Sequence, residues 1–331
     1  MFERFLTRRE LLKYASLSSL FLLSSCRNIS EEVRITLQSN LYPDFFKDTI
    51  PNFWKKENIN FGSINSENNR NLILNSDFTL INDGWVNRIN FDAFKKINED
   101  ILFENLDLRS RDFLNSYEKT QREKLFPVGV VPYSVVIKNN KELIDSAKLS
   151  WDFLLSKRLT KKIIFPNSPR ILLSIAKKIQ GSNSLLRLKN QSMLFDDQNS
   201  LNWLINSEAC VAIIPYTLCL KYIKIDSRLS IVFPNQGVPL MWHFILSRSN
   251  NNEILIKWIK SLEGKLSADK LASQGWYLPF NNSYSQKKYN PDISSINGPS
   301  LRCWENSWSF PYLSNMQKIN LEKSWNQSST P

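Results

Sequence analysis

Nine polar and aromatic residues of this 331-residue chain lie where predicted strands end or where a predicted helix starts. Ligands in open α/β sheets bind at the carboxyl ends of strands, and aromatic side chains commonly line such clefts. The candidate ligand contacts are Ser39, Asn40, Asp83, Trp85, Ser168, Arg170, Tyr216, Trp242 and Trp276. For each aromatic residue in this set, packing in the core or at a hinge is the alternative interpretation.

Asp83 and Arg170 are the two charged residues in this set. The Asp83 carboxylate could hold a cationic group, although an Asp before a glycine such as Gly84 is also a common turn former. Arg170 follows Ser168 at a predicted helix start, where free N–H groups favour an anion. The alternative there is a capped helix with a solvated arginine. The two residues therefore leave a cationic, an anionic and a zwitterionic ligand open.

The residue types needed for catalysis are scarce. His243 is the only histidine, so any Ser-His-Asp or Cys-His mechanism must use it, yet its apolar strand favours a structural histidine. Cys210 lies in a buried-looking strand, where a thiol is usually inert. The sequence has no GxxxxGK, GxGxxG or CxxC motif and no Cys/His cluster, so no phosphate cradle or zinc site is indicated. We therefore expect no enzyme activity, no cofactor and no metal.

Strands and helices alternate along the chain, as hydrophobic spacing and turn residues indicate. Predicted strands are 33–37, 78–81, 161–165, 209–215, 229–234 and 238–247; predicted helices are 42–56, 151–155, 170–180, one after Tyr216, and 253–263. Segments 127–135 and 232–240 combine β-branched residues with proline and glycine, which suits chain crossings between two lobes. The pattern predicts an α/β fold of two lobes joined by crossing hinge strands.

The N-terminal residues have the pattern of an export signal. Arg8 and Arg9 resemble the twin-arginine motif, and the apolar run from Leu17 to Leu23 is shorter than the roughly 20 residues that span a bilayer. The following Ser-Ser-Cys sequence completes a motif that resembles a bacterial lipobox, which predicts that Cys26 carries a lipid and begins the mature chain. A buried amphipathic first helix is the alternative.

The chain is strongly basic, with a formal net charge of +12. Removal of residues 1–25 takes away four basic and two acidic residues and leaves +10. Such a charge suggests an acidic partner, but the Lys and Arg residues are scattered along the sequence instead of forming one stripe. Because export also argues against it, we expect no nucleic-acid partner.

Three cysteines remain if Cys26 is lipidated: Cys210, Cys219 and Cys303. In an oxidising compartment one disulfide among them is possible, and the sequence leaves its pairing open.

Four stretches together resemble a known family, the extracellular solute-binding proteins of ABC transporters, in their polyamine (spermidine/putrescine)-binding branch. They are VRITLQSNLYPDFFKDTIPNFWKKENI (33–59), SWDFLLSKRLTKKIIFPNSPRILLSIAKKIQG (150–181), IVFPNQGVPLMWHFILS (231–247) and EILIKWIKSLEGKLSADKLASQGWYLPFN (253–281). The resemblance implies a type II periplasmic-binding-protein fold that closes on a solute.

The resemblance also implies a ligand site in which carboxylates hold ammonium groups and aromatic rings cover the chain of a polyamine. The family's aromatic and acidic positions fall on Gln38 and Asn40, its two acids at the helix start on Ser168 and Ile171, and its later Trp and Asp near Leu240 and Trp242. Each ionised acceptor replaced by a neutral group removes charge-assisted bonds worth about 1.5–3 kcal/mol. We therefore expect a smaller amine, a zwitterion or an anion, and not a long polyamine.

These observations predict a lipid-anchored, twin-arginine-exported protein on the periplasmic side of a bacterial membrane, which captures a small solute as a monomer and passes it to an ABC permease. An exported enzyme or scaffold with a changed or lost ligand site is the alternative. The expected organisation is a signal peptide (1–25), a linker (26–32), lobe 1 (33–130 and 238–280), lobe 2 (131–237) and a wrapping C-terminal tail (281–331) that docks through Trp304 and Trp308.

Overall fold

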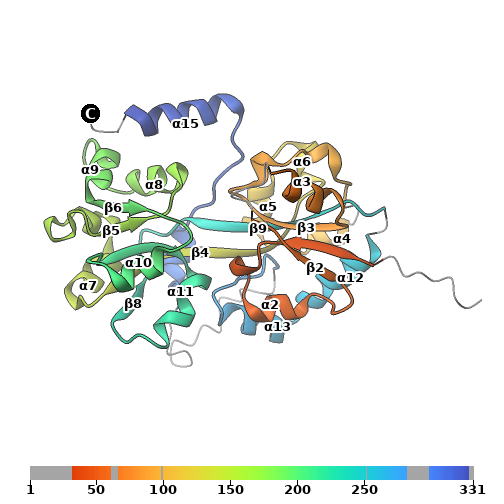
Figure 1. Cartoon of the computed structure of the whole chain (residues 1–331), viewed down its shortest axis with the longest axis horizontal. Helices are drawn as coiled ribbons and strands as arrows, with labels where there is room; N and C mark the ends of the chain where they lie inside the picture. Colours follow the sequence, from red (N-terminus) through yellow and green to blue (C-terminus); the bar gives the residue numbers. More distant parts are fainter. Residues whose placement is uncertain (1–31, 61–65, 98–99, 251, 282–297, 328–331) are drawn as a thin grey trace, which may run out of the picture.

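The computed structural model describes residues 32–60, 66–97, 100–250, 252–281 and 298–327. The predicted signal peptide, most of the linker and Cys26 lie outside these residues. Within them the chain forms two lobes, and β4 and β9 run between the lobes (Figure 1). No helix in the described part of the chain is long and apolar enough to cross a membrane.

The strands lie in the order β2-β1-β3-β9-β4-β7-β5-β6, and β8 pairs with β4. Their bounds are β1 (Arg34–Leu37), β2 (Lys55–Asn58), β3 (Phe78–Asn82), β4 (Phe126–Lys138), β5 (Ile163–Phe165), β6 (Ser192–Phe195), β7 (Val211–Pro215), β8 (Leu229–Val232) and β9 (Leu240–Ser247). In the first lobe β1 is parallel to β2 and β3, and in the second β5 is parallel to β6 and β7. Both halves are therefore α/β layers, as the alternation predicts.

The long strand β4 belongs to both lobes. Its first half, from Phe126 to Pro132, pairs with β9, and its second half, from Tyr133 onward, pairs with β7 and β8. Twelve of its thirteen residues are buried, as expected for a strand rich in valine and covered on both faces. The register shifts between Pro127 and Gly129, where Trp276 packs so closely that a Cβ on Gly129 would lie 2.1 Å from the indole.

Helices cover the strands in both lobes. They are α2 (Asp44–Thr49), α3 (Glu67–Leu74), α4 (Asp100–Glu104), α5 (Leu108–Leu114), α6 (Lys119–Arg122), α7 (Lys141–Leu149), α8 (Pro169–Ala176), α9 (Ser184–Gln191), α10 (Ser200–Asn206), α11 (Tyr216–Ile223), α12 (Glu253–Leu262) and α13 (Lys265–Ala272). Short 3-10 helices are η1 (Ser39–Leu41), η3 (Val86–Arg88), η4 (Phe91–Ala93), η5 (Trp151–Leu155) and η6 (Lys157–Leu159). The Ser150 hydroxyl caps η5 by accepting a bond from the Asp152 amide, and Pro169 begins α8, as predicted.

The prediction of one helix over 42–56 is wrong. Helix α2 ends at Thr49, Ile50 is extended, and Lys55–Asn58 forms the edge strand β2. The cause is Pro51, since a residue before proline avoids the helical conformation. Phe53, one of the apolar residues at helical spacing in this stretch, is 69% exposed.

The C-terminal part contains more structure than the sequence suggests. The sequence analysis assigned no helix to this tail, and the structure forms two there, α14 (Leu301–Asn306) and α15 (Asn315–Gln327). Ser300 caps α14 through a 3.1 Å bond from the Cys303 amide, and α15 lies along α8 and α9 (Figure 1), where Lys189 stands 3.8 Å from the centre of the Trp325 ring. Residues 282–297 lie outside the described part.

The three described cysteines are free thiols, so the disulfide that the sequence allowed is not formed. Cys219 is buried in α11 beside the Ser134 hydroxyl, while Cys303 is buried in α14. Cys210 precedes β7 and is only partly covered. The three thiols belong to separate packing environments, and no pair of them is bridged.

Candidate functional site

The antiparallel pairing of β3 with β9 brings Asp83 against Trp242. The Asp83 amide donates to the Trp242 carbonyl at 2.9 Å, and the Trp242 amide donates to Asp83 Oδ1 at 3.2 Å. Asp83 is only 5% exposed. The turn that follows β3 therefore directs a carboxyl group into the junction between the lobes.

Arg170 faces this carboxyl group from the other lobe. Burial raises the pKa of Asp83 to about 6, and the positive charge of Arg170 opposes that rise. Burial likewise lowers the pKa of Arg170, which Asp83 opposes in turn. The start of α8 at Pro169 fixes Arg170 in the first helical turn. The charges of Asp83 and Arg170 therefore influence each other across the junction, and their roles in ligand binding stay predictions.

Trp242 is packed between lobe 1 and the C-terminal part of the chain. Its ring stacks on Phe113 of α5, with centroids 4.9 Å apart and an interplanar angle of 19°. Its indole Nε1 donates to Ser309 Oγ at 2.8 Å. A side chain predicted to contact a ligand is therefore already bonded to another part of the same chain.

Residues Ser307–Tyr312, here called the C-terminal segment, run through the junction and also engage Arg170. The Arg170 guanidinium donates to the Pro311 carbonyl and stands 4.7 Å from the centre of the Phe310 ring. The sequence prediction placed an anionic ligand group at Arg170. In the structure a carbonyl and an aromatic face of the chain itself occupy that position.

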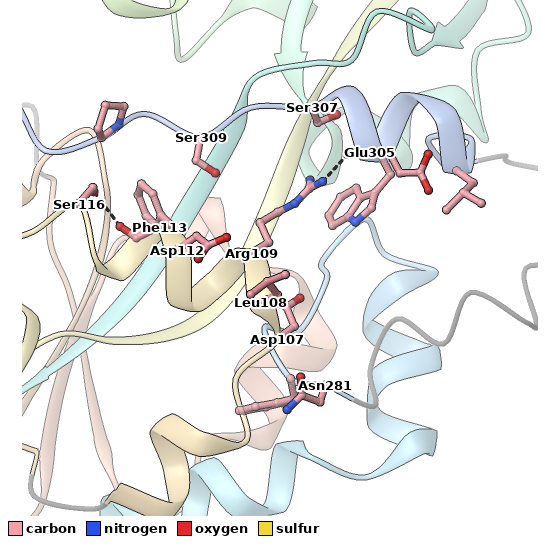
Figure 2. A pocket seen from close by; sticks show the side chains of 14 residues that line it. Asp107, Leu108, Arg109, Asp112, Phe113, Ser116, Asn281, Glu305, Ser307 and Ser309 are labelled. Carbon is pink, nitrogen blue, oxygen red and sulfur yellow. Dashed lines mark hydrogen bonds between the residues drawn. The ribbon is translucent and has the colours of Figure 1, made fainter.

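A pocket of about 650 Å³ lies between α5 and the C-terminal segment (Figure 2). It is lined by Asp107, Leu108, Arg109, Asp112, Phe113, Ser116, Phe280, Asn281, Leu301, Trp304, Glu305, Ser307, Ser309 and Pro311. Figure 2 shows that Arg109 extends from α5 toward α14, with Ser309 facing the pocket from the tail. Its volume falls within the range of small-molecule sites, and it is largely open to solvent.

Two charged groups of the pocket are hydrogen-bonded within the protein, and two are exposed to solvent. Asp107 caps α5, because its Oδ1 accepts the Ser110 amide at 2.7 Å. Arg109 donates to the Trp304 carbonyl at 2.7 Å and lies 5.0 Å from the centre of that ring. Asp112 and Glu305 are exposed at the pocket mouth. With three carboxylates and one guanidinium, the lining favours a ligand that carries positive charge and leaves one donor for a negative group.

Sequence reasoning missed this pocket. The only local signal was a pair of acids on α5, Asp107 at its N-cap and Asp112 within the helix. An acid at that spacing is more often a helix cap, which Asp107 indeed is. Glu305 lies nearly 200 positions later, and no pattern in the sequence connects it with α5.

Two predicted ligand contacts, Ser39 and Asn40, are not among the residues that line the pocket. The Ser39 amide and hydroxyl both donate to Asn58 Oδ1 at 2.9 Å, and Asn40 is exposed. Ser168 precedes α8 and makes no side-chain capping bond. Their role in ligand binding stays a prediction.

Trp242 and Trp276, both candidate ligand contacts, lie in separate environments, as does Trp85. Adjacent residues of a strand point to opposite faces, so the side chains of Trp242 and His243 lie on opposite faces of β9. Trp276 is fully buried on the His243 face, with the two ring centroids 4.6 Å apart. Trp85 instead lies 4.8 Å from the Arg88 guanidinium in its own loop.

The remaining aromatic candidate, Tyr216, is packed at the start of α11. It is 2% exposed and meets Phe233 edge-on at 5.0 Å, which agrees with the hinge-packing alternative. His243 is fully buried, and burial lowers its pKa to about 3. Neither of its ring nitrogens has a hydrogen-bond partner among the described residues. The imidazole is therefore neutral and packed, and it does not face a substrate cleft as a general base.

No protein-family model matches this chain, and no curated protein matches its sequence. Solved structures do match over most of its length. One is the spermidine/putrescine ABC transporter substrate-binding protein PotD from Streptococcus pneumoniae, with a TM-score of 0.63 at 9% identity over 89% of this chain and 97% of that one.

Two further structures agree with it. An ABC transporter protein from Clostridium perfringens has a TM-score of 0.61 at 14% identity, covering 89% of this chain and 98% of that one. A ferric binding protein from Campylobacter jejuni has a TM-score of 0.59 at 12% identity, covering 90% and 99%. Similarity at these identities is a statement about architecture. The chain has the two-lobed α/β fold of the periplasmic-binding proteins, as its sequence predicts.

Proposed function

We propose that the protein is a solute-binding component of an ABC importer, which holds a small solute in the pocket between α5 and the C-terminal segment. The observation that carries this proposal is the pocket of about 650 Å³, lined by carboxylates, hydroxyls and aromatic rings, on a two-lobed fold. In this proposal the lobes comprise 33–130 with 238–280, and 131–237. Because no lining residue belongs to 131–237, movement of the lobes about β4 and the 232–240 crossing would change this pocket only through the C-terminal segment.

The lining supports a small amine or a zwitterion as the solute. Asp112 and Glu305 are available to an ammonium group, and Arg109 can receive a negative group beside the Trp304 ring. Charge-assisted hydrogen bonds of this kind contribute about 1.5–3 kcal/mol each. We do not place a negative group of the solute at Arg170, because that group would have to displace the Pro311 carbonyl.

The cellular setting is proposed from the N-terminal sequence. The arginine pair, the short apolar run and Cys26 support export by the twin-arginine route and a lipid anchor on the periplasmic side of a membrane. An ABC permease of that membrane is the proposed partner, and the protein acts as a monomer.

Calorimetric titration and thermal unfolding of the purified protein test the solute. The panel comprises small amines, amino acids and organic anions, and a solute at 100 times its Kd stabilises the fold by about 2.7 kcal/mol. The double variant Asp112→Asn/Glu305→Gln should weaken binding of an amine at least about tenfold. Asp145→Asn, which changes an exposed acid of α7, is the matched control. Binding that is equal in both variants would contradict the pocket assignment.

A second candidate is an exported non-transport protein on the same fold. The observation that favours it is the occupation of Trp242 and Arg170 by the C-terminal segment. An importer predicts permease and ATPase genes beside this gene and loss of solute uptake on its deletion. Intact uptake of every solute that binds the purified protein would favour this second candidate.

A further inference from the structure

We propose that the junction between the lobes is a recognition site for an extended peptide, and that the C-terminal segment is its resident ligand within the same chain. The site accepts a second peptide of the same pattern when the resident segment is weakened. This inference concerns a different ligand from the small solute proposed above, and it stands on the contacts of Ser307–Tyr312 alone.

The backbone of the segment pairs with the crossing that leads into β9. The Trp308 amide donates to the Val238 carbonyl at 3.1 Å, and the Leu240 amide donates to the Trp308 carbonyl at 2.9 Å. Trp308 and Pro239 form a parallel β-bridge. This is the geometry of strand addition, in which main-chain bonds hold an extended peptide beside an exposed edge.

Side chains of the segment alternate between two environments. Ser307, Ser309 and Pro311 line the pocket beside α5. Trp308 and Phe310 point to lobe 2, where Lys178, just after α8, lies 4.8 Å from the Trp308 ring centre and Arg170 of α8 lies 4.7 Å from the Phe310 ring centre. A period of two is the signature of an extended strand that is read on both faces.

The specific contacts explain what the site selects. The Trp242 indole requires a hydrogen-bond acceptor, which Ser309 supplies at 2.8 Å. Arg170 takes both a backbone carbonyl and an aromatic face. Cations over aromatic rings contribute roughly 0.5–2 kcal/mol per contact when they are partly desolvated. The ligand class is therefore an extended peptide with aromatic residues at every second position and a small hydroxyl residue between them.

The site is shaped for close approach of a peptide backbone. A Cβ on Gly237 would lie 2.1 Å from the Asn306 carbonyl oxygen. The Gly237 carbonyl is fixed from behind by the Trp151 indole at 2.9 Å. A backbone can lie against this position only while it has no side chain.

The test uses the full chain with Trp308→Ala and Phe310→Ala combined. Hydrogen exchange of the Leu240 amide, which is protected by the Trp308 carbonyl, should accelerate at least about tenfold in this variant. A fluorescent peptide with the sequence of 304–313 should then bind the variant at least about tenfold more tightly than the unaltered protein, where the resident segment competes in cis.

Three controls make the result decisive. A peptide with the same composition but with its aromatic residues adjacent should not bind, and adding Arg170→Ala to the double variant should abolish peptide binding. Trp325→Ala, which alters α15 and leaves the segment in place, should not create binding. The proposal is overturned if exchange of the Leu240 amide is unchanged in the double variant, or if it accelerates and the peptide still does not bind. Failure of small-solute titration leaves all of these outcomes unaffected.

Discussion

Replacement of Gly237 by alanine tests how the C-terminal segment is held against the crossing between the lobes. Gly237 has a φ of +87°, and a Cβ there would lie 2.1 Å from the Asn306 carbonyl oxygen and 2.2 Å from its carbonyl carbon. An alanine therefore meets two penalties: a left-handed backbone conformation and a collision with another part of the backbone.

The cost of the left-handed backbone and the cost of the collision can be measured separately. A non-glycine residue in the left-handed region costs about 1–2 kcal/mol, and overpacking a tight site costs about 1–3 kcal/mol more. Gly181→Ala is the matched control, because Gly181 has a φ of +92° while its nearest obstacle is the flexible end of Arg187 at 3.1 Å. Gly237→Ala should therefore be less stable than Gly181→Ala by about 1–3 kcal/mol.

Urea unfolding measures the stability difference, and hydrogen exchange locates it. The collision is relieved most easily if the segment leaves, so the Leu240 amide, bonded to the Trp308 carbonyl at 2.9 Å, should exchange faster in Gly237→Ala and not in Gly181→Ala. Equal stability and equal exchange in the two variants would contradict the expected collision, since they would mean that the backbone at 306–307 does not press against Gly237.

Four other predictions concern single groups. Burial raises the pKa of Asp83 to about 6 from 3.8, so the folded protein loses up to about 3 kcal/mol of stability as pH rises from about 4 to above 6; urea titrations should show this loss removed in Asp83→Asn. The pKa of His243 is lowered to about 3 from 6.5, so stability falls by up to about 5 kcal/mol as pH falls through that window; His243→Phe should flatten this slope, and an unaltered slope would contradict the assignment. Cys26→Ala should move the protein from the membrane fraction to the soluble fraction, as immunoblotting would detect, whereas a persistent membrane fraction would rule out the lipid anchor. Calorimetry with spermidine should show no micromolar binding, which needs about 8 kcal/mol, because a chain left at +10 repels a polycation at long range.

Local signals in the sequence predicted the elements well. The Ser150 cap, the proline start of α8 and the buried run of β4 each depend on residues a few positions apart. Such short-range patterns set the order of strands and helices, and that order limits the architectures available to the chain. The two-lobed α/β fold could therefore be predicted before any packing was known.

The error at 42–56 shows the limit of this reasoning. Aromatic spacing indicated one helix, yet Pro51 ended it and Lys55–Asn58 joined the edge of the sheet. Pairing of β2 with β1 supplies hydrogen bonds that no local pattern reports. Tertiary pairing outweighs helical spacing when a proline has already interrupted the helix.

Some residues of the candidate site could be predicted from the sequence, and others were identified only by the tertiary structure. The sequence by itself indicated Asp83, Arg170 and Trp242 as residues of the junction, because each stands at a strand end, a helix start or a crossing. Only the tertiary structure decided that Trp276 lies on the opposite face of β9, and that Ser307–Tyr312 fills the space beside Arg170. Contacts between residues separated by 67 and 141 positions depend on which distant surfaces pack together, and the free energy of that packing is a property of the whole fold that no short stretch encodes.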